Sequence, residues 1–365
     1  MKRIYLMSVL FFFCILGPNL LFFLFRGSGE EANTENRELA SFPAFSPEEI
    51  DAFPAAVEAY VNDHAAFRGP FLSLNAGLNL ALFHHADSLD VITGTDGWYF
   101  YSAGSSVEDY LGVNRFSAGQ LSEIAARVEE TAAYFKERGT QFLLLIAPNK
   151  ESVYREYLPG DFPKDEKTTR RSELIAYLQR HTSVPVVDPY PAMRSDRSVQ
   201  WYYQTDTHWN DAGGFLASQL LIKACGGTPT PISEVTVSWE PHDMGDLANL
   251  FHMPPSLNRE QNAVISGYYD GLSMDFADVN GDGNLVHVRT PDAPDPRRIA
   301  IYRDSFGSAL LTGLSHYFQE TDFYHWQHFD ASLLNENPPD LLVYQVVERD
   351  LGRISEDLAR LTAQD

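Results

Sequence analysis

The sequence predicts an α/β fold with a doubly wound, mainly parallel sheet. Short apolar runs alternate with segments whose apolar residues recur at helical spacing. One run, Phe142–Ala147, contains no polar residue, which is typical of a strand buried on both faces. Strands that alternate with helices are typical of a parallel sheet with helices on both sides.

The composition is that of a globular protein. The chain has 365 residues, of which 44% are hydrophobic and 21% charged, and this length suits one large domain or two modest ones. The net charge of −23 argues against binding to nucleic acid or to an anionic membrane surface. Cys14 lies in an apolar leader, so only Cys225 remains downstream and no internal disulfide is expected there.

Residues 1–26 have the pattern of a signal anchor. Lys2 and Arg3 precede the apolar run Ile4–Phe25, which has about the length needed to cross a bilayer. The positive end is expected to stay in the cytoplasm, which predicts a single-pass protein of the cell membrane with its folded part outside. Gly27–Gly29 is only a weak cleavage site, so a cleaved signal peptide is the alternative. A linker is expected at 27–45, followed by one domain at 46–365.

The first part of this domain is predicted to be helical and to end in a hairpin. Residues 46–83 carry apolar residues at helical spacing, with Pro47 in a plausible first turn. His84 and His85 follow, and adjacent histidines face different ways on a helix, so they are not expected to share a metal. Asp96-Gly97 predicts a tight turn between strands at 91–92 and 98–101.

The alternating part of the chain begins at Ser117. Ser117 and Gln120 predict a capping box, and the helix that follows keeps an apolar face up to Gly139. After the apolar strand, residues 148–150 lie at its carboxyl end, where ligands bind in open α/β sheets. Further elements are predicted in the order helix 168–181, strand 184–188, helix 211–225 and a last strand at 340–347.

Residues 229–296 are expected to form inserted loops and hairpins, because they are rich in Pro, Asp, Gly and Asn. Asp278–Asn284 resembles the first half of a calcium loop, but Arg289 stands where the bidentate glutamate is needed. A tight hairpin turn is therefore the preferred interpretation. The chain has no glycine-rich phosphate loop, and we expect neither a cofactor nor a metal.

Asp206 and His208 are the candidate base of a nucleophilic triad. In an extended segment, residues two apart point to the same side. Asp206 is therefore expected to orient the His208 imidazole and to leave its other nitrogen free to take a proton. Taken alone, such a pair is more often a solvated loop or half of a structural hydrogen bond.

Ser305 is the candidate nucleophile. An apolar strand that begins at Arg298 runs into a sharp turn and then into an apolar helical pattern, with Ser305 at the junction. A hydroxyl there is expected to be exposed, and its backbone N–H is expected to receive an oxyanion. Because an Asp-Ser pair at a strand end is usually just a helix N-cap, the hypothesis rests on both motifs together.

Both motifs resemble those of a known family. Thr205–Asn210 and Arg303–Phe306 look like the alginate O-acetyltransferase (AlgX/AlgJ-like) family of SGNH-hydrolase-like proteins. In that family the Asp-x-His motif precedes the serine, opposite to ordinary GDSL hydrolases, and this chain has the same permuted order. The likeness spans about residues 35 to 350 and includes Glu35–Leu39, Gly94–Phe100, Pro148–Lys150 with Tyr154, Gly245–Leu247 and Val346–Arg349.

The resemblance implies an O-acetyltransferase with Ser305 as nucleophile, His208 as base and Asp206 as its orienting partner. It implies that the acceptor is an exported polysaccharide and that a membrane-bound acyltransferase supplies the acetyl groups. Arg303 stands where the family has the glycine of a GDS motif, which alters the expected oxyanion pocket. Candidates for further oxyanion or substrate contacts are Asn149, Lys150, Tyr154, Trp209 and Arg303.

Two other functions remain open from the sequence. A carbohydrate acetylesterase would use the same residues, with water in place of the sugar as attacking group. A non-catalytic surface protein on the same scaffold would bind glycan or organise a complex. For the acetyltransferase, the candidates for stacking on sugar rings are Trp201, Tyr203, Trp209 and Trp326, although such residues are more often core. The negative net charge would repel a uronic-acid polymer unless the groove is locally basic.

Overall fold

The computed structural model describes residues 5–13, 17, 39–46, 48, 50–64, 68–279, 281–335 and 337–363. The chain forms two compact units, one of residues 1–88 with 248–258 and the other of residues 89–247 with 259–365. The second unit contains all the residues predicted to form the site.

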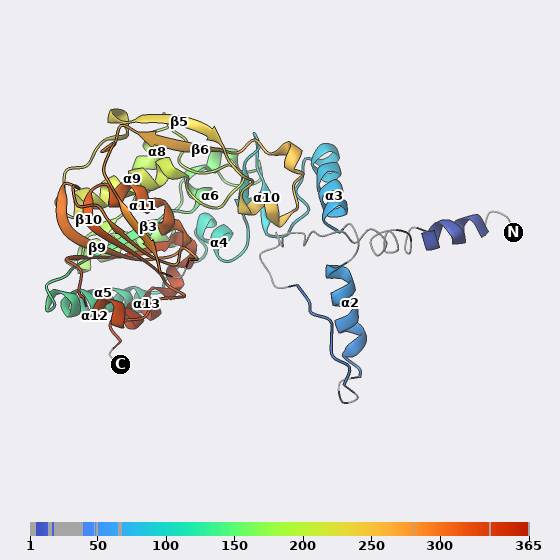
Figure 1. Ribbon diagram of the computed structural model, residues 1–365, viewed down its shortest axis with the longest axis horizontal. Coiled ribbons are helices and arrows are strands. Elements are labelled where there is room, and N and C mark those ends of the chain that lie inside the picture. Colours follow the sequence, from blue (N-terminus) through green and yellow to red (C-terminus); the bar gives the residue numbers. More distant parts are fainter. Residues whose placement is uncertain are drawn as a thin grey trace. The chain divides into compact units, whose positions relative to one another are not determined.

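The second unit is built on a seven-stranded mixed sheet (Figure 1). Its strands are β3 (Gln141–Ala147), β4 (Val186–Val187), β7 (Asp275–Asp278), β8 (Leu285–Arg289), β9 (Asp295–Arg303), β10 (Phe318–His325) and β11 (Leu341–Val347). They lie in the order β4-β3-β11-β9-β10-β8-β7. Neighbours from β4 to β10 are parallel, whereas β8 and β7 are antiparallel additions. A mainly parallel sheet, as predicted, is confirmed.

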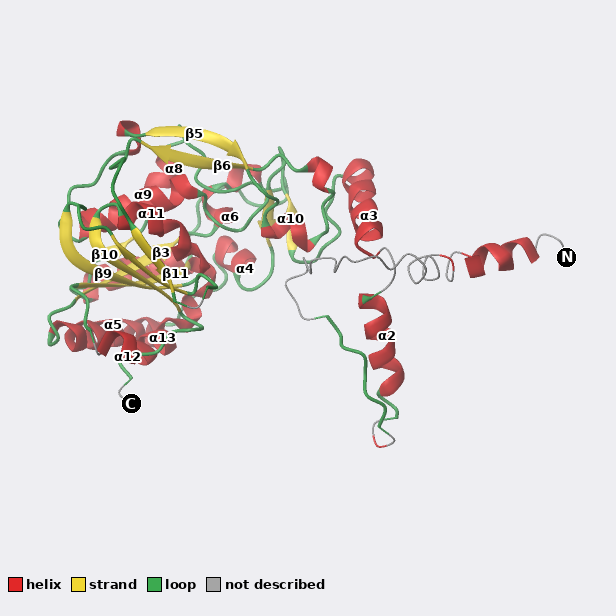
Figure 2. Cartoon of the chain, in the orientation of Figure 1, coloured by secondary structure: helices red, strands yellow, loops and turns green. Residues whose placement is uncertain are grey.

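Helices cover both faces of this sheet (Figure 2). On one face pack α5 (Ala118–Lys136), α7 (Arg170–His181) and α13 (Ile354–Leu361), and on the other α9 (Asp211–Ala224) and α11 (Leu311–Ser315). Leu143 and Leu145 of β3 join the core on the α9 side, while Leu144 and Ile146 join the core on the α5 side. Because successive strand residues point to opposite faces, a strand between two layers of helices is apolar throughout.

The starts of two helices follow from side-chain caps. At α5, the Ser117 hydroxyl accepts from the Gln120 backbone N–H, and the Gln120 side chain accepts from the Ser117 N–H, which confirms the predicted capping box. Thr169 and Ser172 make the same exchange at the start of α7. Each box satisfies backbone donors that the first helical turn leaves without partners.

Residues 229–296 contain two hairpins, in line with the prediction of loops and hairpins. β5 (Thr236–Pro241) and β6 (Gln261–Ser266) form a separate antiparallel hairpin, as expected of an insertion. The second hairpin, β7 and β8, instead extends the main sheet. Strand β10, which pairs with β8, is absent from the prediction because its stretch Gln319–Asp322 is polar. Pairing with β9 and β8 holds this segment in the sheet, and no local apolar pattern indicates it.

Shorter elements connect the sheet to its helices. The predicted hairpin with Asp96-Gly97 is present as β1 (Val91–Thr93) and β2 (Tyr99–Tyr101), and both turn residues have the positive φ that such a turn needs. The remaining helices and 3₁₀ turns of this unit are α4 (Ser106–Leu111), α6 (Lys150–Val153), η2 (Arg155–Tyr157), α8 (Tyr190–Ser195), η3 (Ile232–Glu234), η5 (Ser305–Leu310), α12 (Ser332–Asn335) and η6 (Glu348–Arg353). α10 (Asp246–Leu250) begins in this unit, and η4 (Pro255–Leu257) lies in the first.

The first unit contains the N-terminal helices. The segment predicted to be helical, 46–83, includes α2 (Phe53–Asp63) and α3 (Arg68–Phe83). Residues 5–13 are also helical and expose their large apolar side chains. Of the predicted anchor, residues 1–4, 14–16 and 18–26 lie outside the described residues, as do residues 27–38 of the predicted linker. Among the helices of the described ranges, none is long and apolar enough to span a membrane.

Candidate active site

Ser305 lies at the carboxyl end of the sheet, in a turn that Asp304 holds. One carboxylate oxygen of Asp304 accepts hydrogen bonds from the Phe306 N–H and from the Gln345 side-chain amide, both at 2.8 Å. The other oxygen accepts from the Val347 N–H at 2.6 Å. These bonds tie the end of β9 to the end of β11. They bury Asp304 and leave the Ser305 side chain exposed at the start of η5.

Asp206 and His208 lie in a narrow loop whose two sides meet at the bridge between Tyr202 and Trp209. The Asp206 carboxylate accepts from the His208 backbone N–H at 2.8 Å and lies 2.6 Å from its Nδ1. This is an Asx-type turn, so the expectation that an extended segment places the two side chains on the same side is wrong. The proximity comes from the carboxylate bonding to the backbone two residues on.

The structure brings the three predicted residues into one hydrogen-bonded row. His208 Nε2 lies 2.8 Å from Ser305 Oγ, and Nδ1 lies 2.6 Å from Asp206 Oδ1. With Asp206 ionised, Nδ1 carries the proton and Nε2 can accept from the Ser305 hydroxyl. The imidazole and the carboxylate are both mostly covered, at 27% and 20% exposed.

The charges around His208 favour an imidazole that holds a proton readily. Burial lowers its pKa, but the hydrogen bond and charge of Asp206 and the charge of Asp246 together raise the pKa above its ordinary value. For the Asp206 carboxyl, burial acts in the opposite direction and raises the pKa. The hydrogen bond and charge of His208 outweigh that effect, so the net shift of the Asp206 pKa is downward.

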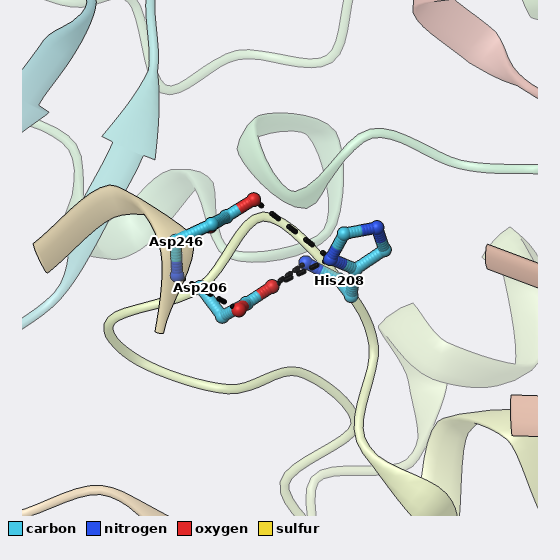
Figure 3. A group of neighbouring side chains, drawn as sticks. All are labelled: Asp206, His208 and Asp246. Carbon is cyan, nitrogen blue, oxygen red and sulfur yellow. Dashed lines mark hydrogen bonds and ion pairs between the residues drawn. The ribbon is translucent and has the colours of Figure 1, made fainter. Parts of the chain in front are cut away.

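Asp246, which was not among the predicted site residues, completes the surroundings of His208 (Figure 3). Its backbone N–H donates to Asp206 Oδ2 at 2.9 Å, and one of its carboxylate oxygens lies 3.9 Å from His208 Nδ1. Its two oxygens also accept from the Thr207 N–H and hydroxyl at 2.7 and 2.6 Å. The available signal was Gly245–Leu247, which resembles a family landmark but has no assigned role in the sequence prediction.

Gly245 permits this approach. A Cβ atom at Gly245 would lie 2.4 Å from the Thr205 carbonyl and 2.4 Å from the Asp206 Cβ. Such contacts are far inside van der Waals distance, so only glycine lets the start of α10 lie against the Asp206 loop.

Lys150 supports this loop, and its geometry does not suit the expected contact with an oxyanion or substrate. The side chain is buried, and Nζ donates to the carbonyls of Tyr99, Gln204 and Asp206 at 2.6, 2.8 and 2.9 Å. An ammonium has three N–H donors, and all three are used. Burial lowers the pKa of Lys150 to about 8. Lys150 therefore holds the backbone around Asp206 in place through these three hydrogen bonds.

Three other predicted contact residues are buried with partners of their own. The Asn149 side-chain oxygen accepts from the Arg349 N–H at 3.1 Å, and the Tyr154 hydroxyl accepts from the Trp201 N–H at 2.7 Å. The Trp209 indole donates to the Phe306 carbonyl at 2.8 Å. These bonds hold the nucleophile turn and the surrounding loops through Tyr154 and Trp209. The Asn149 side-chain nitrogen is buried without a hydrogen-bond partner among the described residues, so Asn149 stays a candidate for an oxyanion or substrate contact.

The Arg303 guanidinium, like the Lys150 ammonium, is hydrogen-bonded to backbone carbonyls. It donates to the carbonyl of Asp304 at 3.3 Å and to that of Gly283. Burial lowers its pKa. Because β9 and η5 are so close at this point, a Cβ atom at Gly307 would lie 2.5 Å from the Arg303 Cβ. Arg303, which stands in place of a GDS glycine, thus stabilises the loop between β7 and β8 through its bond to Gly283.

One group of residues has the composition of a metal site. Asp206, His208 and Asp246 offer ligand atoms within 4.8 Å of one another. In the present geometry His208 Nδ1 is hydrogen-bonded to Asp206 at 2.6 Å. A metal bound to Nδ1 would have to displace that proton and with it the bond that orients the imidazole. The residues therefore fit a base with two carboxylate neighbours better than a metal site.

Comparisons with known proteins find related sequences. The family model for the SGNH hydrolase-like domain of the acetyltransferase AlgX matches residues 91–267. The probable alginate O-acetylase AlgJ of Pseudomonas syringae pv. tomato is 21% identical over 319 residues, covering 80% of this chain and 77% of that protein. The protein of the same name from Pseudomonas fluorescens is 23% identical, with coverage of 80% and 76%.

Solved structures share the fold. Bacillus cereus PatB1 superposes with a TM-score of 0.57 at 15% identity, over 74% of this chain and 99% of PatB1. A DHHW family protein from Eubacterium siraeum gives a TM-score of 0.54 at 15% identity, over 75% and 99%. The fold is SGNH hydrolase-like, and the resemblance to the AlgX/AlgJ-like proteins that the sequence motifs indicate is confirmed.

Proposed function

We propose that this chain, a relative of the alginate O-acetyltransferases, moves acetyl groups through a serine ester onto hydroxyl groups of an exported polysaccharide. The observation that carries the proposal is the row of Asp206, His208 and Ser305 with separations of 2.6 and 2.8 Å. Hydrogen-bond reach from nucleophile to base, and from base to an orienting carboxylate, is what acyl transfer by a serine requires.

In the first half-reaction Ser305 Oγ attacks the carbonyl carbon of the acetyl donor while His208 Nε2 takes the hydroxyl proton. The backbone N–H of Ser305 is the expected donor to the oxyanion. The bond to the donor's leaving oxygen then breaks, and His208 returns the proton to that oxygen. Asp206 stabilises the imidazolium that exists between these two proton transfers.

In the second half-reaction a sugar hydroxyl takes the place of the leaving group. His208 Nε2 accepts the proton of that hydroxyl as its oxygen attacks the acetyl carbon of the serine ester. The Ser305–acetyl bond breaks, and Ser305 Oγ regains the proton from His208. The product is an acetylated sugar, and the enzyme returns to its starting state.

We also propose the surroundings that the N-terminal sequence pattern and the motif resemblance imply. Residues 1–26 would anchor the chain in the cell membrane with the site outside the cytoplasm. A membrane-bound acyltransferase would hand over the acetyl groups. The alternative function is a carbohydrate acetylesterase, in which water attacks the same serine ester.

The catalytic proposal is tested by alanine substitutions measured with a chromogenic acetate ester. Ser305→Ala and His208→Ala should each remove most turnover, equivalent to roughly 4–8 kcal/mol of barrier, because the members of such a triad act as a unit. Asp206→Ala should be milder, since the base itself remains. Ser308→Ala is the matched control, because Ser308 is an exposed serine of the same turn, three residues on.

Two additional measurements separate the rival functions. With an oligosaccharide acceptor present, acetyl should appear on the sugar and the share released as acetate should fall; equal acetate release with every acceptor favours the esterase. Treatment with a chelator should leave turnover unchanged, whereas its loss and recovery with a divalent metal would support a metal site at Asp206, His208 and Asp246. Wild-type turnover in all three alanine variants would favour a glycan-binding protein without catalysis.

A further inference from the structure

Glu260 is a buried carboxylate that the proposed mechanism does not use. It directly precedes β6 in the inserted β5–β6 hairpin and is 3% exposed. One carboxylate oxygen accepts from the Thr205 backbone N–H at 2.6 Å and from the Thr205 hydroxyl at 2.5 Å. The other oxygen accepts from the Gln204 N–H at 3.1 Å. Glu260 therefore binds the two residues that directly precede Asp206.

Glu260 and Lys150 hold the same stretch of backbone through opposite kinds of polar group. The Lys150 ammonium donates to the carbonyls of Gln204 and Asp206. The Glu260 carboxylate accepts from the N–H groups of Gln204 and Thr205. Burial lowers the pKa of Lys150, and the charge of Glu260 is the largest influence that opposes this effect. The two side chains therefore also stabilise each other where an unpaired charge is costly.

The Thr205 hydroxyl extends this network to Asp246. Because a carboxylate only accepts hydrogen bonds, the hydroxyl donates to Glu260 and keeps its lone pairs for another donor. That donor is the Gly245 N–H, at 3.0 Å. The next N–H along the chain, that of Asp246, donates to Asp206 Oδ2 at 2.9 Å. Glu260 is thus connected to the Asp206 carboxylate through the backbone of Thr205 and through the start of α10.

The same hairpin contacts the loop that carries the base at two further points. The ring of Tyr203 stacks on that of His242, which directly follows β5, with 4.9 Å between the ring centres. The Tyr203 hydroxyl donates to the Asn262 side-chain oxygen at 2.8 Å, and the Asn262 amide donates to the Asp211 carboxylate at 2.9 Å. Tyr203 precedes the base and Asp211 follows it, so the hairpin holds the loop on both sides of the base.

We propose that Glu260 is a positioning residue of the base: by holding Thr205, it keeps the Asp206 carboxylate on Nδ1 of His208. An orienting group must stay within about 0.5 Å of its productive position to be effective, and that precision comes from the residues that support it. The inserted hairpin then contributes to catalysis through Glu260. This inference rests on the proposed triad and adds the residue that keeps its base aligned.

The first measurement compares turnover of a small acetate ester by Glu260→Gln and wild type. An amide of the same shape has one acceptor oxygen and two N–H donors, so it cannot accept all the hydrogen bonds from Gln204 and Thr205. With Asp206 displaced, kcat should fall about 10- to 100-fold, whereas KM should stay within about twofold, because misalignment of a catalytic group by about 1 Å has effects of this size. Expressing kcat per serine labelled to completion by a sulfonyl fluoride leaves unfolded molecules out of the comparison.

The second measurement is the pKa of His208, followed by NMR titration and identified by the signal that His208→Gln lacks. Burial lowers this pKa, and the charge of Arg349 acts in the same direction. Asp206 and, less strongly, Asp246 raise the pKa, and their effect outweighs the lowering. If Glu260→Gln moves Asp206 away from Nδ1, the pKa of His208 should fall. The acidic limb of kcat/KM should shift to lower pH with it.

Three matched variants separate position from charge and from stability. Thr205→Val leaves every charge in place but removes the hydroxyl that donates to Glu260, so the pKa of His208 should again fall. Thr205→Ser keeps that hydroxyl and should behave like wild type. Asp357→Asn changes a carboxylate of α13 that is also 3% exposed and that accepts from two tyrosine hydroxyls at 3.1 and 2.9 Å. It should cost stability without moving kcat per labelled serine or the pKa of His208.

The NMR titration needs no turnover, so it separates this role from the proposed function. If the pKa of His208 falls in Glu260→Gln but wild type transfers no acetyl, the transfer proposal fails and the positioning role stands. A pKa of His208 equal to that of wild type in Glu260→Gln overturns the positioning role and leaves Glu260 with a purely structural one. Should Glu260→Gln not fold, the comparison of Thr205→Val with Thr205→Ser decides in the same way, since equal pKa values of His208 in these two variants overturn the role.

Discussion

At the scale of single residues, the site depends on side chains that do not react. Asp246 adds negative charge beside His208 and also holds Thr207, whereas Lys150 binds three carbonyls of the surrounding backbone. Both act on the Asp206–His208 pair, but in different ways. The charge of Asp246 changes the pKa of His208, whereas the hydrogen bonds of Lys150 hold the loop that carries Asp206 and His208 in place.

Asp246→Asn should move the pH dependence of turnover. Because the charge of Asp246 contributes to raising the pKa of His208, its removal should lower that pKa. The reaction needs the neutral imidazole, so the acidic limb of kcat/KM should shift to lower pH, with a loss at the optimum of about tenfold or less, roughly 1.4 kcal/mol.

The control for this variant is Asp243→Asn, which removes an equal charge three positions earlier at an exposed residue. It should leave the profile in place. A profile for Asp246→Asn that coincides with wild type would show that Asp246 does not influence the charge of the base.

Lys150→Met should reduce both stability and turnover. It removes a buried cation and leaves three carbonyls without their donor, which should destabilise the fold by about 3–5 kcal/mol in denaturant unfolding. Lys164→Met is the comparison: Lys164 is exposed and also donates to three carbonyls, those of Arg155, Leu158 and Pro159. Lys164→Met should cost less stability than Lys150→Met and should leave turnover unchanged. A larger loss of stability or turnover in Lys164→Met than in Lys150→Met would contradict the role assigned to Lys150.

At the scale of elements, the nucleophile turn is fixed by close packing of α9 on η5. Gly214 of α9 lies directly under Ala309 of η5: a Cβ atom at Gly214 would lie 2.3 Å from the Ala309 carbonyl oxygen and 2.6 Å from its Cβ. The Ser218 hydroxyl, one helical turn on, donates to the Gly214 carbonyl at 2.8 Å and lies 3.3 Å from the Leu310 carbonyl oxygen. Glycine in the helix therefore sets how near the turn that carries Ser305 can approach.

Gly214→Ala should push these elements apart. Overpacking of this kind costs about 1–3 kcal/mol of stability, and turnover should fall because Ser305 begins the displaced turn. Gly119→Ala, in the first turn of α5, is the matched change, since its Cβ would meet only the Ser117 hydroxyl at 3.9 Å. It should be neutral or stabilise by up to about 1 kcal/mol. Equal thermal midpoints and turnover for both variants would exclude the packing argument.

At the scale of the whole molecule, the unit built on the sheet and the apolar N-terminal segment differ in how far their apolar side chains are covered. The sheet unit has buried cores on both faces. Residues 5–13, by contrast, form a helix with large apolar side chains that remain exposed. Such exposed apolar surface is stable in a lipid environment.

The full chain should therefore remain in the membrane fraction after washing with carbonate. A truncated chain that begins at Glu30 should be soluble and should keep its turnover of a small acetate ester. Appearance of a mature chain that starts near residue 28 would show cleavage of a signal peptide instead, and loss of folding in the truncated chain would show that the N-terminal segment supports the catalytic unit.

The amino-acid sequence by itself determined the features that depend on local patterns. Apolar runs indicated β3 and β11, capping residues indicated the start of α5, and Asp96-Gly97 indicated a hairpin. The candidate triad could also be named, because a carboxylate, an imidazole and a serine at a strand end are chemically recognisable at their positions.

Only the tertiary structure decided the features that depend on contacts between distant segments. Strand β10 is polar in part and exists through pairing with β9 and β8. Asp246 reaches His208 from 38 positions away along the chain, and Lys150 and Arg303 turned out to bind backbone carbonyls. A side chain's partners depend on which segments the fold brings together, so residue type alone could not show that Lys150 supports the backbone rather than contacting substrate.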